Sequence, residues 1–303
     1  MLYDTVIVGA GTAGLTAAVM LGRSRRRVLV LDGGAPRNAP AAHAHNVFTR
    51  DGTPPLDLLR YALDDLEPYP GVEVRRARAV SIEGEAGAFE VALEDGTSVE
   101  TRAVFLATGV VDELPDVPGV AELWGGTVFH CPYCHGWEVR DKPLVVWMNG
   151  PAAADRAVLL RGWSDDVAVL TDGPSEIGAE GEATLAALGV PVLEGEVAAL
   201  VGTDGLEAVR FRDGTEIARG GLLLSPPQHE SSGLPAALGC ETTETGHVAA
   251  PMGKTSVPGV YAAGDLVHLF QGVAAAAGLA AIAAGVLNHD LAQADAARVL
   301  EAA

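Results

Sequence analysis

Short apolar runs alternate with stretches of helical periodicity along the chain. An apolar run at residues 5–8 is followed by a helical pattern from residue 12 and by a second strand-like run at 27–32. Apolar or alternating runs predict strands, and apolar positions three and four apart predict helices. The further expected strands are 72–82, 88–93, 97–105, 143–148, 167–170, 190–194, 197–201 and 206–212, and the further expected helices are 56–67, 152–161, 180–188 and 273–288. Strands that alternate with helices are typical of an α/β fold with parallel sheets.

The strand–helix–strand layout of the N-terminus returns in the middle of the chain. Residues 143–170 repeat the layout of residues 5–32, which indicates an internal duplication of a nucleotide-binding unit. The length of 303 residues also suggests about two domains. We therefore predict an α/β fold with two Rossmann-like dinucleotide-binding domains.

The first strand leads directly into a glycine-rich turn of the form G-x-G-x-x-G. Gly9 permits the tight turn, Gly11 lets the backbone approach a pyrophosphate, and Gly14 lets helix and strand pack closely. The N-terminus of the helix would face the anion, and Asp32 at the end of the next strand can accept hydrogen bonds from ribose hydroxyls. Because the motif occurs in its full structural context, it predicts a dinucleotide site. The position of the motif does not distinguish FAD from NAD.

The segment from His130 to Trp137 reads H-C-P-Y-C-H-G-W and contains two of the three cysteines of the chain. Cys131 and Cys134 can close into a small, reducible disulfide. A helix N-terminus and a nearby imidazolium would lower the pKa of a thiol in this pair, and His130 and His135 flank it. Redox catalysis is therefore one interpretation of this segment.

Three other interpretations of the same segment stay open at this point. A buried pair of small hydrophobic residues is disfavoured by the flanking histidines. A zinc site would need four ligands from six consecutive positions, which strains a tetrahedral geometry, so no metal site is predicted. The spacing C-x-x-C-H also matches c-type haem attachment, but that chemistry requires export, and the sequence shows no signal peptide.

Composition narrows the class of protein further. The formal net charge of −20 argues against nucleic-acid binding and against docking on anionic lipid. Three cysteines are too few for a disulfide framework, and the N-terminus runs into a strand without a basic leader. We therefore expect a cytoplasmic protein. The apolar helix expected at 273–288 is shorter than a membrane span and contains Gly278 and Gly285, so no membrane segment is predicted.

Two further features have a weaker link to chemistry. His43 and His45 lie in a loop at 33–55 that is rich in Gly, Pro, Ala and Asn. This H-x-H pair has no cysteine or acidic partner nearby in the sequence, so we expect the loop to line a ligand rather than to bind a metal. Cys240 stands alone and is expected to be a core residue.

Five motifs, in order along most of the chain, resemble the low-molecular-weight thioredoxin reductase family of flavoproteins. They are the N-terminal G-x-G-x-x-G with Asp32, Ala107-Thr108-Gly109, the C-x-x-C, the second strand–helix–strand unit, and Tyr261-Ala262-Ala263-Gly264-Asp265. The resemblance implies an FAD domain formed by residues 1–114 and 246–303. It also implies an inserted pyridine-nucleotide-type domain, 115–245, that carries the C-x-x-C, and a homodimeric assembly.

The resemblance assigns roles around FAD to individual residues. The expected cofactor-binding residues are Gly9, Gly11, Gly14, Asp32, Asn46, Thr108, Gly109, Gly264, Asp265, Gln271, Gly272 and Val273. The first four would contact the adenosine diphosphate, Asn46 would lie near the flavin, and Asp265 would bind the ribityl or pyrophosphate part. Gln271, Gly272 and Val273 would face the flavin ring at the start of the last helix, where the helix dipole stabilises a reduced, anionic flavin.

The chain departs from the family pattern in the second nucleotide unit. Family members that use NADPH carry a second glycine motif there and a basic cluster for the 2′-phosphate. In this chain Met148 stands at the first glycine position and is followed by Asn149, Gly150 and Pro151. Asp172 stands where arginines are expected and would repel a 2′-phosphate. We therefore expect NADPH not to bind, while NADH stays an alternative because Asp172 can accept ribose hydroxyls.

The redox segment departs from the reductase pattern as well. Reductases usually carry an acid directly after the second cysteine, whereas this chain carries His135. A C-x-x-C-H-G segment with a leading histidine is similar to a subfamily of dithiol oxidases that form intramolecular disulfides in small sulfur-containing natural products and pass electrons from FAD to oxygen. The resemblance implies a small dithiol and O₂ as partners. By analogy with the family, Cys134 lies nearer the flavin. We expect the substrate to attack Cys131, and His130 or His135 to act as the base because both adjoin the pair.

Two functions other than dithiol oxidation stay open. In the first, the same fold carries electrons in the opposite direction, so that the protein is an NAD(P)H-dependent reductase of thioredoxin or of a small disulfide. The second is a flavoprotein that senses or binds without turnover. A chain without a working nucleotide site has no evident need for domain rotation, so the oxidase reading predicts that the C-x-x-C stays against the flavin.

Overall fold

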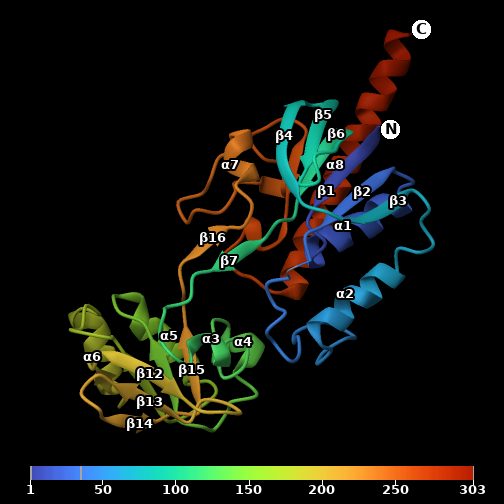
Figure 1. Ribbon diagram of the computed structural model, residues 1–303. Helices are drawn as coiled ribbons and strands as arrows, with labels where there is room; N and C mark the ends of the chain where they lie inside the picture. Colours follow the sequence, from blue (N-terminus) through green and yellow to red (C-terminus); the bar gives the residue numbers. More distant parts are fainter. Residues whose placement is uncertain (1, 35, 303) are drawn as a thin grey trace. The chain divides into compact units, whose positions relative to one another are not determined.

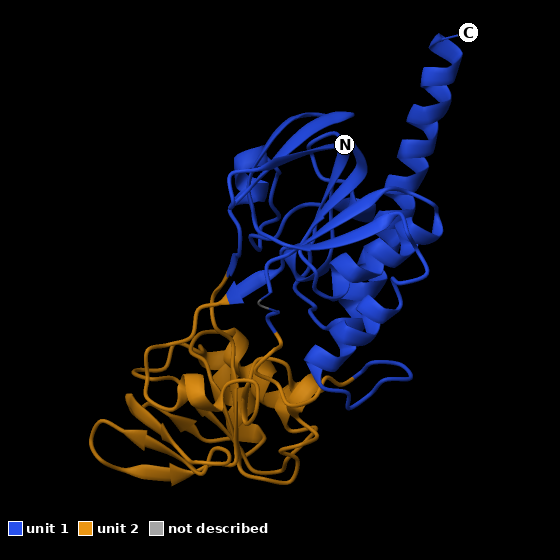
Figure 2. Cartoon of the chain, turned by 45° about the vertical axis from the view of Figure 1, so that its right-hand side comes forward, with its two compact units in different colours: residues 1–37, 46–111, 229–303 blue, residues 38–45, 112–228 orange. Residues whose placement is uncertain are grey.

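The computed structural model describes residues 2–34 and 36–302 and divides into two compact units. The first unit comprises Met1–Arg37, Asn46–Val111 and His229–Ala303, and the second comprises Asn38–His45 and Asp112–Gln228 (Figure 2). Each unit has its own parallel sheet and its own hydrophobic core (Figure 1). The predicted fold class, α/β with two Rossmann-like units, is therefore confirmed.

The sheet of the first unit has the strand order β3-β2-β1-β6-β5-β4, with β17 paired to β6. Strands β3, β2, β1, β6 and β17 are parallel, whereas β4 and β5 form an antiparallel extension. The strands are β1 (Tyr3–Val8), β2 (Val28–Asp32), β3 (Val72–Arg76), β4 (Ala79–Glu85), β5 (Ala88–Leu93), β6 (Ser98–Leu106) and β17 (Val260–Ala262). The helices are α1 (Thr12–Arg23), α2 (Pro55–Asp64), α7 (Leu234–Leu238) and α8 (Val273–Glu301), with 3₁₀ turns η1 (Pro251–Gly253) and η2 (Gly264–Leu266).

Side chains alternate along β1 and so reach a core on each face of the sheet. Ile7 packs into a core that also contains residues of α1 and α8, whereas Val6 and Val8 pack into a second core with residues of β17. The residues that α1 and α8 contribute to the first core are mostly alanine and leucine. The alanine side chains are small, and they allow the two helices to pack closely at the face of the sheet that carries the glycine turn.

The second unit has a parallel sheet in the order β11-β10-β9-β15-β8 and a separate antiparallel sheet in the order β12-β13-β14. The parallel strands are β8 (Val128–Phe129), β9 (Leu144–Trp147), β10 (Val167–Leu170), β11 (Val192–Leu193) and β15 (Gly221–Leu224). The antiparallel strands are β12 (Val197–Val201), β13 (Ala208–Phe211) and β14 (Glu216–Ala218). The helices are α3 (Val120–Leu123), α4 (Pro132–His135), α5 (Ala152–Leu160) and α6 (Ala179–Ala187).

Strand β9 is buried on both faces, which explains its uninterrupted apolar sequence. Leu144 and Val146 pack with residues of α5 and α6, and Val145 and Trp147 pack with residues of β12 and β13. The carboxyl ends of parallel strands meet at one edge of a sheet, where ligands bind in open α/β folds. The C-x-x-C follows β8 and the nucleotide-type turn follows β9, so both groups of candidate residues belong to the same edge.

The chain passes between the units where β7 (Val110–Asp112) pairs with β16 (Gln228–Glu230). The sequence placed the boundaries after residues 114 and 245, whereas the structure places them after 111 and 228. The second boundary moves because Leu234 and Cys240 pack into the core of the first unit. Cys240 is therefore a buried core residue, as expected. Residues 38–45, which the sequence assigned to the FAD domain, belong to the second unit.

The last helix is longer than expected, because α8 continues to Glu301 whereas the sequence predicted an end at residue 288. Its glycines do not interrupt it. Among the described residues α8 is the helix that is long and apolar enough to cross a membrane by length and composition alone, which corrects the expectation that it is too short. Its first turns pack against α1, and in its later part Asp295 forms ion pairs with Arg26 and Arg102. These contacts fit a helix that packs within its own unit.

Other element boundaries moved by smaller amounts. The strand expected at 72–82 is divided into β3 and β4, and the helix expected at 56–67 ends at Asp64.

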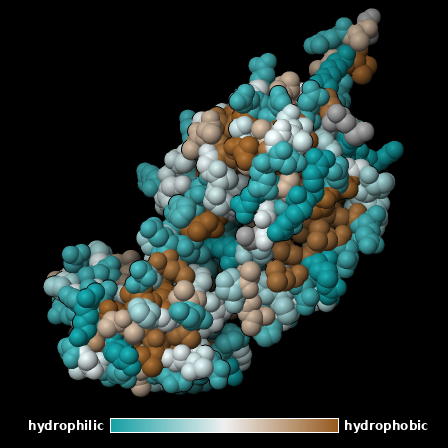
Figure 3. Space-filling view, in the orientation of Figure 1, coloured by the Kyte–Doolittle hydropathy of each residue, from teal (hydrophilic) through white to brown (hydrophobic). Residues whose placement is uncertain are grey.

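The face of the molecule seen in Figure 3 is largely polar, in keeping with the acidic composition, with apolar residues gathered over the region of α1 and α2. Exposed apolar side chains on these two helices include Met20, Leu56 and Leu63.

Candidate active site

Cys131 and Cys134 form a disulfide, with their Cα atoms 5.3 Å apart. Cys131 is the extended residue that precedes α4, and Cys134 lies within this helix. Pro132 suits the first helical position because it has no N–H group to leave unsatisfied there. Since α4 follows β8 after a short turn, the fold places both sulfur atoms at the carboxyl edge of the parallel sheet.

Aromatic side chains support and border the disulfide segment. A Cβ on Gly136 would lie 2.9 Å from the ring of Trp163, so the turn after α4 packs directly on this indole. Tyr133 meets the same indole edge-on, with ring centroids 5.6 Å apart. Trp137 is 65% exposed and lies under the guanidinium of Arg140 at 4.0 Å. An exposed aromatic surface therefore adjoins the disulfide.

His135 is held by its own hydrogen bond and by ring stacking. Its Nε2 lies 3.1 Å from the backbone oxygen of Gly125, and its ring stacks on Phe129 with centroids 5.8 Å apart. A carbonyl oxygen only accepts, so this bond selects the neutral tautomer with hydrogen on Nε2 and leaves a lone pair on Nδ1. Nδ1 is buried and has no hydrogen-bond partner among the described residues. Burial lowers the pKa of His135, so the ring is neutral at pH 7.

The loop of residues 38–45 contributes to the surroundings of His135. His45 Nε2 lies 3.4 Å from Glu138 Oε1. Glu138 raises the pKa of His135 and His45 lowers it, although burial is the larger influence. A Cβ on Gly125 would lie 2.8 Å from Pro40, so the loop packs tightly against the turn that binds His135. The sequence treated this loop only as ligand-lining, because no spacing rule connects it to the redox segment.

His130 occupies a different aromatic environment from His135. Its ring lies 5.8 Å from that of Trp124, with the planes 30° apart, and the residue is partly buried. It directly precedes Cys131 in the chain. The structure thus places both candidate bases in the redox segment, and which of them moves a proton stays a prediction.

The glycine turn of the first unit leaves room for a ligand at one position. A Cβ on Gly9 would lie 2.3 Å from the Ala107 oxygen, and one on Gly14 would lie 1.8 Å from the Gly9 oxygen, so both glycines are required by packing. A Cβ on Gly11 would meet no atom within 4 Å. No side chain caps α1 at this end, so its first N–H groups are available to an anion. This cradle fits the pyrophosphate of FAD.

Arg37 connects two of the predicted cofactor residues. Its Nη1 donates to Asp265 Oδ2 at 2.9 Å and to Gln271 Oε1 at 2.6 Å. A Cβ on Gly264, which has φ of 81°, would lie 2.9 Å from Ala13 Cβ, so the turn that carries Asp265 packs against the start of α1. The predicted residues therefore gather around the glycine turn. The sequence analysis missed Arg37, because no motif fixes a residue in this loop.

The start of α8 provides a second open helix end. Gly272 is the cap residue, no side chain caps the helix, and Val273 is the first helical residue. A Cβ on Gly272 would meet no atom within 4 Å. The N–H groups of the first turn are thus available to a ligand, as expected for residues that face a flavin. Their contact with FAD stays a prediction.

Asp32 and Asn46 already have partners within the chain. Asp32 accepts a hydrogen bond from Gly34 N at 2.7 Å and from Arg76 Nη1 at 3.1 Å. Asn46 has a left-handed backbone with φ of 61°, and its N–H donates to Asp51 Oδ1 at 2.6 Å. These bonds fix the loop ends that follow β2 and precede α2. The roles of both residues toward FAD stay predictions.

Thr108 and Gly109 follow β6. Hydrogen bonds connect Thr108 to the segment with which the chain returns to the first unit. Thr108 Oγ1 donates to Glu230 Oε1 at 3.1 Å, and the Thr108 backbone oxygen accepts from Ser231 Oγ at 2.8 Å. Gly109 has φ of 68°, a conformation that favours glycine. The structure thus gives this turn a role in fixing the return strand, and contact with FAD stays a prediction.

The turn after β9 differs chemically from the glycine turn of the first unit. Asn149 Oδ1 accepts hydrogen bonds from Gly150 N at 2.9 Å and from Glu176 N at 2.8 Å. The carboxamide therefore occupies a backbone N–H that a phosphate would otherwise bind. Pro151, which caps α5, has no N–H to offer. A Cβ on Gly150 would meet no atom within 4 Å, as at Gly11. The expectation that this turn does not bind a pyridine nucleotide stays a prediction.

Comparisons with known proteins identify the family. Residues 3–285 match the family described as pyridine nucleotide-disulphide oxidoreductase. Thioredoxin reductase tcpT of Claviceps purpurea is 32% identical over 284 residues, which cover 87% of this chain and 86% of that protein. Thioredoxin reductase aclD of Aspergillus oryzae is 34% identical over 280 residues, which cover 87% of this chain and 88% of that protein.

Solved structures agree with this assignment. The crystal structure of HlmI has a TM-score of 0.93 and 43% identity, covering 99% of this chain and 96% of that chain. An oxidoreductase from Agrobacterium tumefaciens has a TM-score of 0.90 and 34% identity, covering 96% and 99%. The resemblance to thioredoxin reductase-like flavoproteins is thereby confirmed. The chain belongs to the pyridine nucleotide-disulphide oxidoreductase family, as a thioredoxin reductase-like, FAD-binding oxidoreductase.

Proposed function

We propose that the protein is a dithiol oxidase that forms an intramolecular disulfide in a small sulfur-containing natural product. The substrate dithiol loses two electrons and two protons and becomes a disulfide, and O₂ gains both and becomes hydrogen peroxide. FAD, when bound in the first unit, supplies the electron transfer between the cysteine pair and oxygen. The disulfide in the redox segment and the chemistry of the turn after β9 support this proposal.

The Cys131–Cys134 disulfide is the group that the substrate reduces. A substrate thiolate attacks Cys131, forms a mixed disulfide, and releases Cys134 as a thiolate. The second substrate thiol then attacks the substrate sulfur of the mixed disulfide, so the product leaves as a disulfide and Cys131 is released. Both cysteines are then reduced by the two electrons that the substrate has lost. The choice of Cys131 as the first point of attack rests on the family resemblance.

His135 is suited to accept the proton of a substrate thiol. Only the thiolate is nucleophilic, so each attack requires a base. The neutral His135 ring has its lone pair on Nδ1 and can accept a proton without first losing one. Because Nδ1 is buried in this structure, the role of base requires that the nitrogen become accessible to the substrate. His130, on the other side of the disulfide segment in sequence, is the alternative base.

The choice of an oxidase over a reductase rests on the hydrogen bond from Gly150 N to Asn149 Oδ1. A reductase draws its electrons from NADPH or NADH bound in the second unit. In this chain the Asn149 carboxamide takes an N–H of the phosphate turn, and Pro151 removes another. Electrons must then enter through thiols of the substrate.

Flavin absorbance under anaerobic conditions tests the proposal. The FAD-loaded protein is mixed first with NADPH or NADH and then, in a fresh sample, with dithiothreitol. We expect only the dithiol to bleach the flavin, and air to restore the colour with release of hydrogen peroxide. Prompt bleaching by NADPH or NADH would contradict the proposal. A Cys131→Ser sample serves as the control, because its flavin should not respond to the dithiol.

The names of these relatives, both called thioredoxin reductases, favour a second candidate, an NAD(P)H-dependent disulfide reductase. It would use the same Cys131–Cys134 pair with the opposite direction of electron flow. The nucleotide step of the same experiment separates the two functions. Reduction of thioredoxin or of a small disulfide at the expense of NADPH would establish the reductase.

A further inference from the structure

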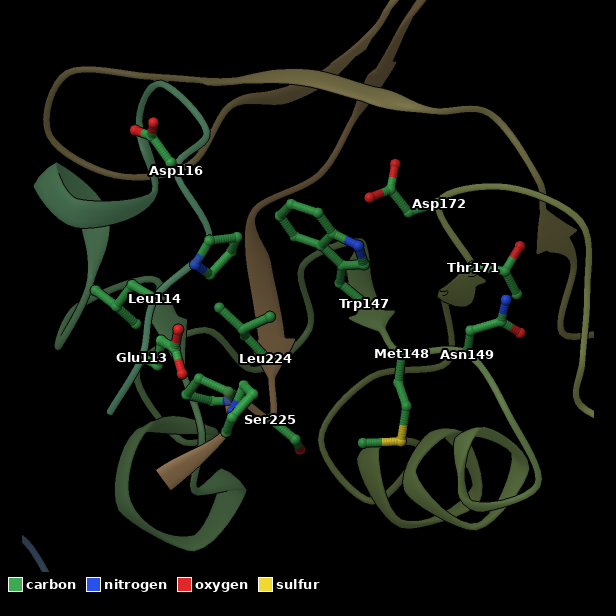
Figure 4. Close-up of a pocket in the computed structure, with 13 residues that line it drawn as sticks. Glu113, Leu114, Asp116, Trp147, Met148, Asn149, Thr171, Asp172, Leu224 and Ser225 are labelled. Atoms are coloured by element: carbon green, nitrogen blue, oxygen red, sulfur yellow. The ribbon is translucent and has the colours of Figure 1, made fainter. Parts of the chain in front are cut away.

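The second unit contains an open pocket of about 670 Å³ at the carboxyl edge of its parallel sheet (Figure 4). The ends of β9, β10 and β15 line it, together with the segment that follows β7. This volume falls in the range of pockets that take small organic ligands. The turn after β9 borders the pocket through Met148 and Asn149.

Trp147 presents an unused hydrogen-bond donor in this pocket. The residue is only 8% exposed, yet its indole N–H makes no hydrogen bond with any of the described residues. Figure 4 shows the indole ring within the pocket, with its nitrogen on the side of Asp172. Buried indole N–H groups usually find a partner. The indole nitrogen is not among the fully buried atoms without a partner in the described chain, so its N–H faces the open pocket. A ligand there can supply the acceptor in place of water.

The charged groups of the pocket are all acidic. Glu113, Asp116 and Asp172 line it, and no ion pair joins any of them to a cation within residues 2–34 and 36–302. Asp172 uses Oδ1 to accept Val197 N at 2.7 Å, which anchors its left-handed loop. No lysine or arginine lines the pocket within the described chain. Uncompensated carboxylates repel anions and attract cations, more strongly where water is partly excluded.

The remaining wall is apolar. Met148, Leu114 and Leu224 line the pocket, and Figure 4 shows Leu114 and Leu224 on the side of the Trp147 ring away from Asp172, with Met148 below the ring. Apolar walls and an indole favour a flat ring system, and the indole face is the best aromatic partner for a cation. A ligand that satisfies this arrangement combines a flat apolar body with a positive, hydrogen-donating group.

We propose that this pocket binds a small aromatic cation, with its ring against Trp147 and its amidinium- or ammonium-type group hydrogen-bonded to Asp116 or Asp172. A charge-assisted hydrogen bond to a carboxylate is roughly twice as strong as a neutral one. The site is separate from the Cys131–Cys134 disulfide, and it does not depend on the direction of electron flow there.

Three probes of nearly identical shape test the charge requirement. Benzamidine is a cation, benzamide is neutral and benzoate is an anion at pH 7. Each is titrated with the FAD-loaded full-length protein, and binding is followed by ligand-observed NMR. We expect benzamidine to bind at least about 10-fold more tightly than benzamide, and this advantage to shrink at high salt. Equal affinities for benzamidine and benzamide, or saturable binding of benzoate at the same site, would overturn the proposal.

Variants locate the site on the acidic surface. Asp116→Asn should reduce benzamidine affinity toward that of benzamide, and so should Asp172→Asn, whose amide oxygen still accepts the Val197 N–H. Trp147→Phe should weaken all binding. Asp165→Asn is the matched control, because Asp165 is an exposed acid of the same unit outside the pocket. If Asp165→Asn weakened benzamidine as much as Asp116→Asn, the binding would be nonspecific attraction to an acidic protein and the proposal would fail.

Discussion

The hydrogen bond between His135 Nε2 and the Gly125 oxygen, 3.1 Å long, leaves Nδ1 as the nitrogen that can take up a proton. Packing holds the ring in this orientation, because Phe129 stacks on it and Pro40 lies in close contact with the turn at Gly125. Burial also keeps the ring neutral at pH 7 by lowering its pKa. A neutral imidazole directly after Cys134 in the chain can act as a base toward a thiol once its buried Nδ1 becomes accessible.

Replacing His135 by Asn should therefore slow dithiol turnover. We expect kcat to fall by about 10²- to 10⁴-fold, the usual effect of removing a general base, while FAD content stays unchanged. In the wild type, kcat/KM should rise with pH through the depressed pKa of His135, below about 6.5. This limb should be absent from the variant. Oxygen consumption with dithiothreitol across pH 5–8 measures both effects.

His130→Asn is the matched comparison for that experiment. A larger loss in His130→Asn than in His135→Asn would assign the base to His130. Unchanged turnover in both variants would show that neither histidine moves the proton.

Stability should also depend on pH through His135. Because its pKa is lowered by burial in the folded state, the unfolded chain binds more protons between that lowered value and about 6.5. The free energy of unfolding should therefore fall as the pH drops through this window. Urea unfolding at pH 7.5 and 5.5 measures the change. His135→Asn should show a smaller loss between the two pH values, and an equal loss would mean that other groups dominate.

The cysteines should separate into a reactive pair and an inert residue. Cys131→Ser and Cys134→Ser should each lower dithiol turnover by at least about 10³-fold, because the electron-accepting disulfide cannot form. Burial raises the pKa of Cys240, so its thiol stays protonated and unreactive. Cys240→Ala should keep full turnover, with a modest loss of thermal stability from the core. Loss of turnover in Cys240→Ala with retained FAD would contradict this division.

Gly11 and Gly14 should respond differently to the same small change. A Cβ on Gly11 meets no atom within 4 Å, so Gly11→Ala should leave the apoprotein as stable as the wild type and weaken FAD binding at least about 10-fold. A Cβ on Gly14 would lie 1.8 Å from the Gly9 oxygen, so Gly14→Ala should destabilise the fold by about 1–3 kcal/mol. Thermal unfolding of apoprotein and FAD titration separate the two effects. Equal loss of stability in both variants would show that Gly11 is a packing glycine.

Local patterns account for what the sequence predicted well. Gly14 is required by its contact with Gly9 within one strand–turn–helix unit, so the motif itself carries that information, whereas Gly9 also approaches Ala107 at the end of β6. The same holds for the buried strand β9, whose apolar run reflects burial on both faces. The expectation that Met148 and Pro151 exclude a pyridine nucleotide also rests on a single turn, and it stays a prediction.

Contacts between distant segments account for what the sequence could not predict. Arg37 and His45 lie in a loop without periodicity, and their partners Asp265 and Glu138 come from other parts of the chain. Charged and polar residues interrupt the last turns of α8, so the apolar pattern ends at residue 288 although ion pairs through Asp295 hold the helix beyond it. Such pairings follow from the tertiary fold rather than from any local pattern.

The insertion of the second unit between β6 and β17 has a consequence for the order of folding during synthesis. These strands are hydrogen-bonded neighbours, yet residues 112–228 separate them along the chain. The first sheet cannot be completed, and α8 cannot cover α1, until the ribosome has passed the whole inserted unit. The second unit, nearly continuous in sequence, can collapse first and bring the two ends of β7 and β16 together. A nascent chain released after residue 228 would therefore leave the apolar face of α1 without its cover and become a substrate for chaperones and proteases.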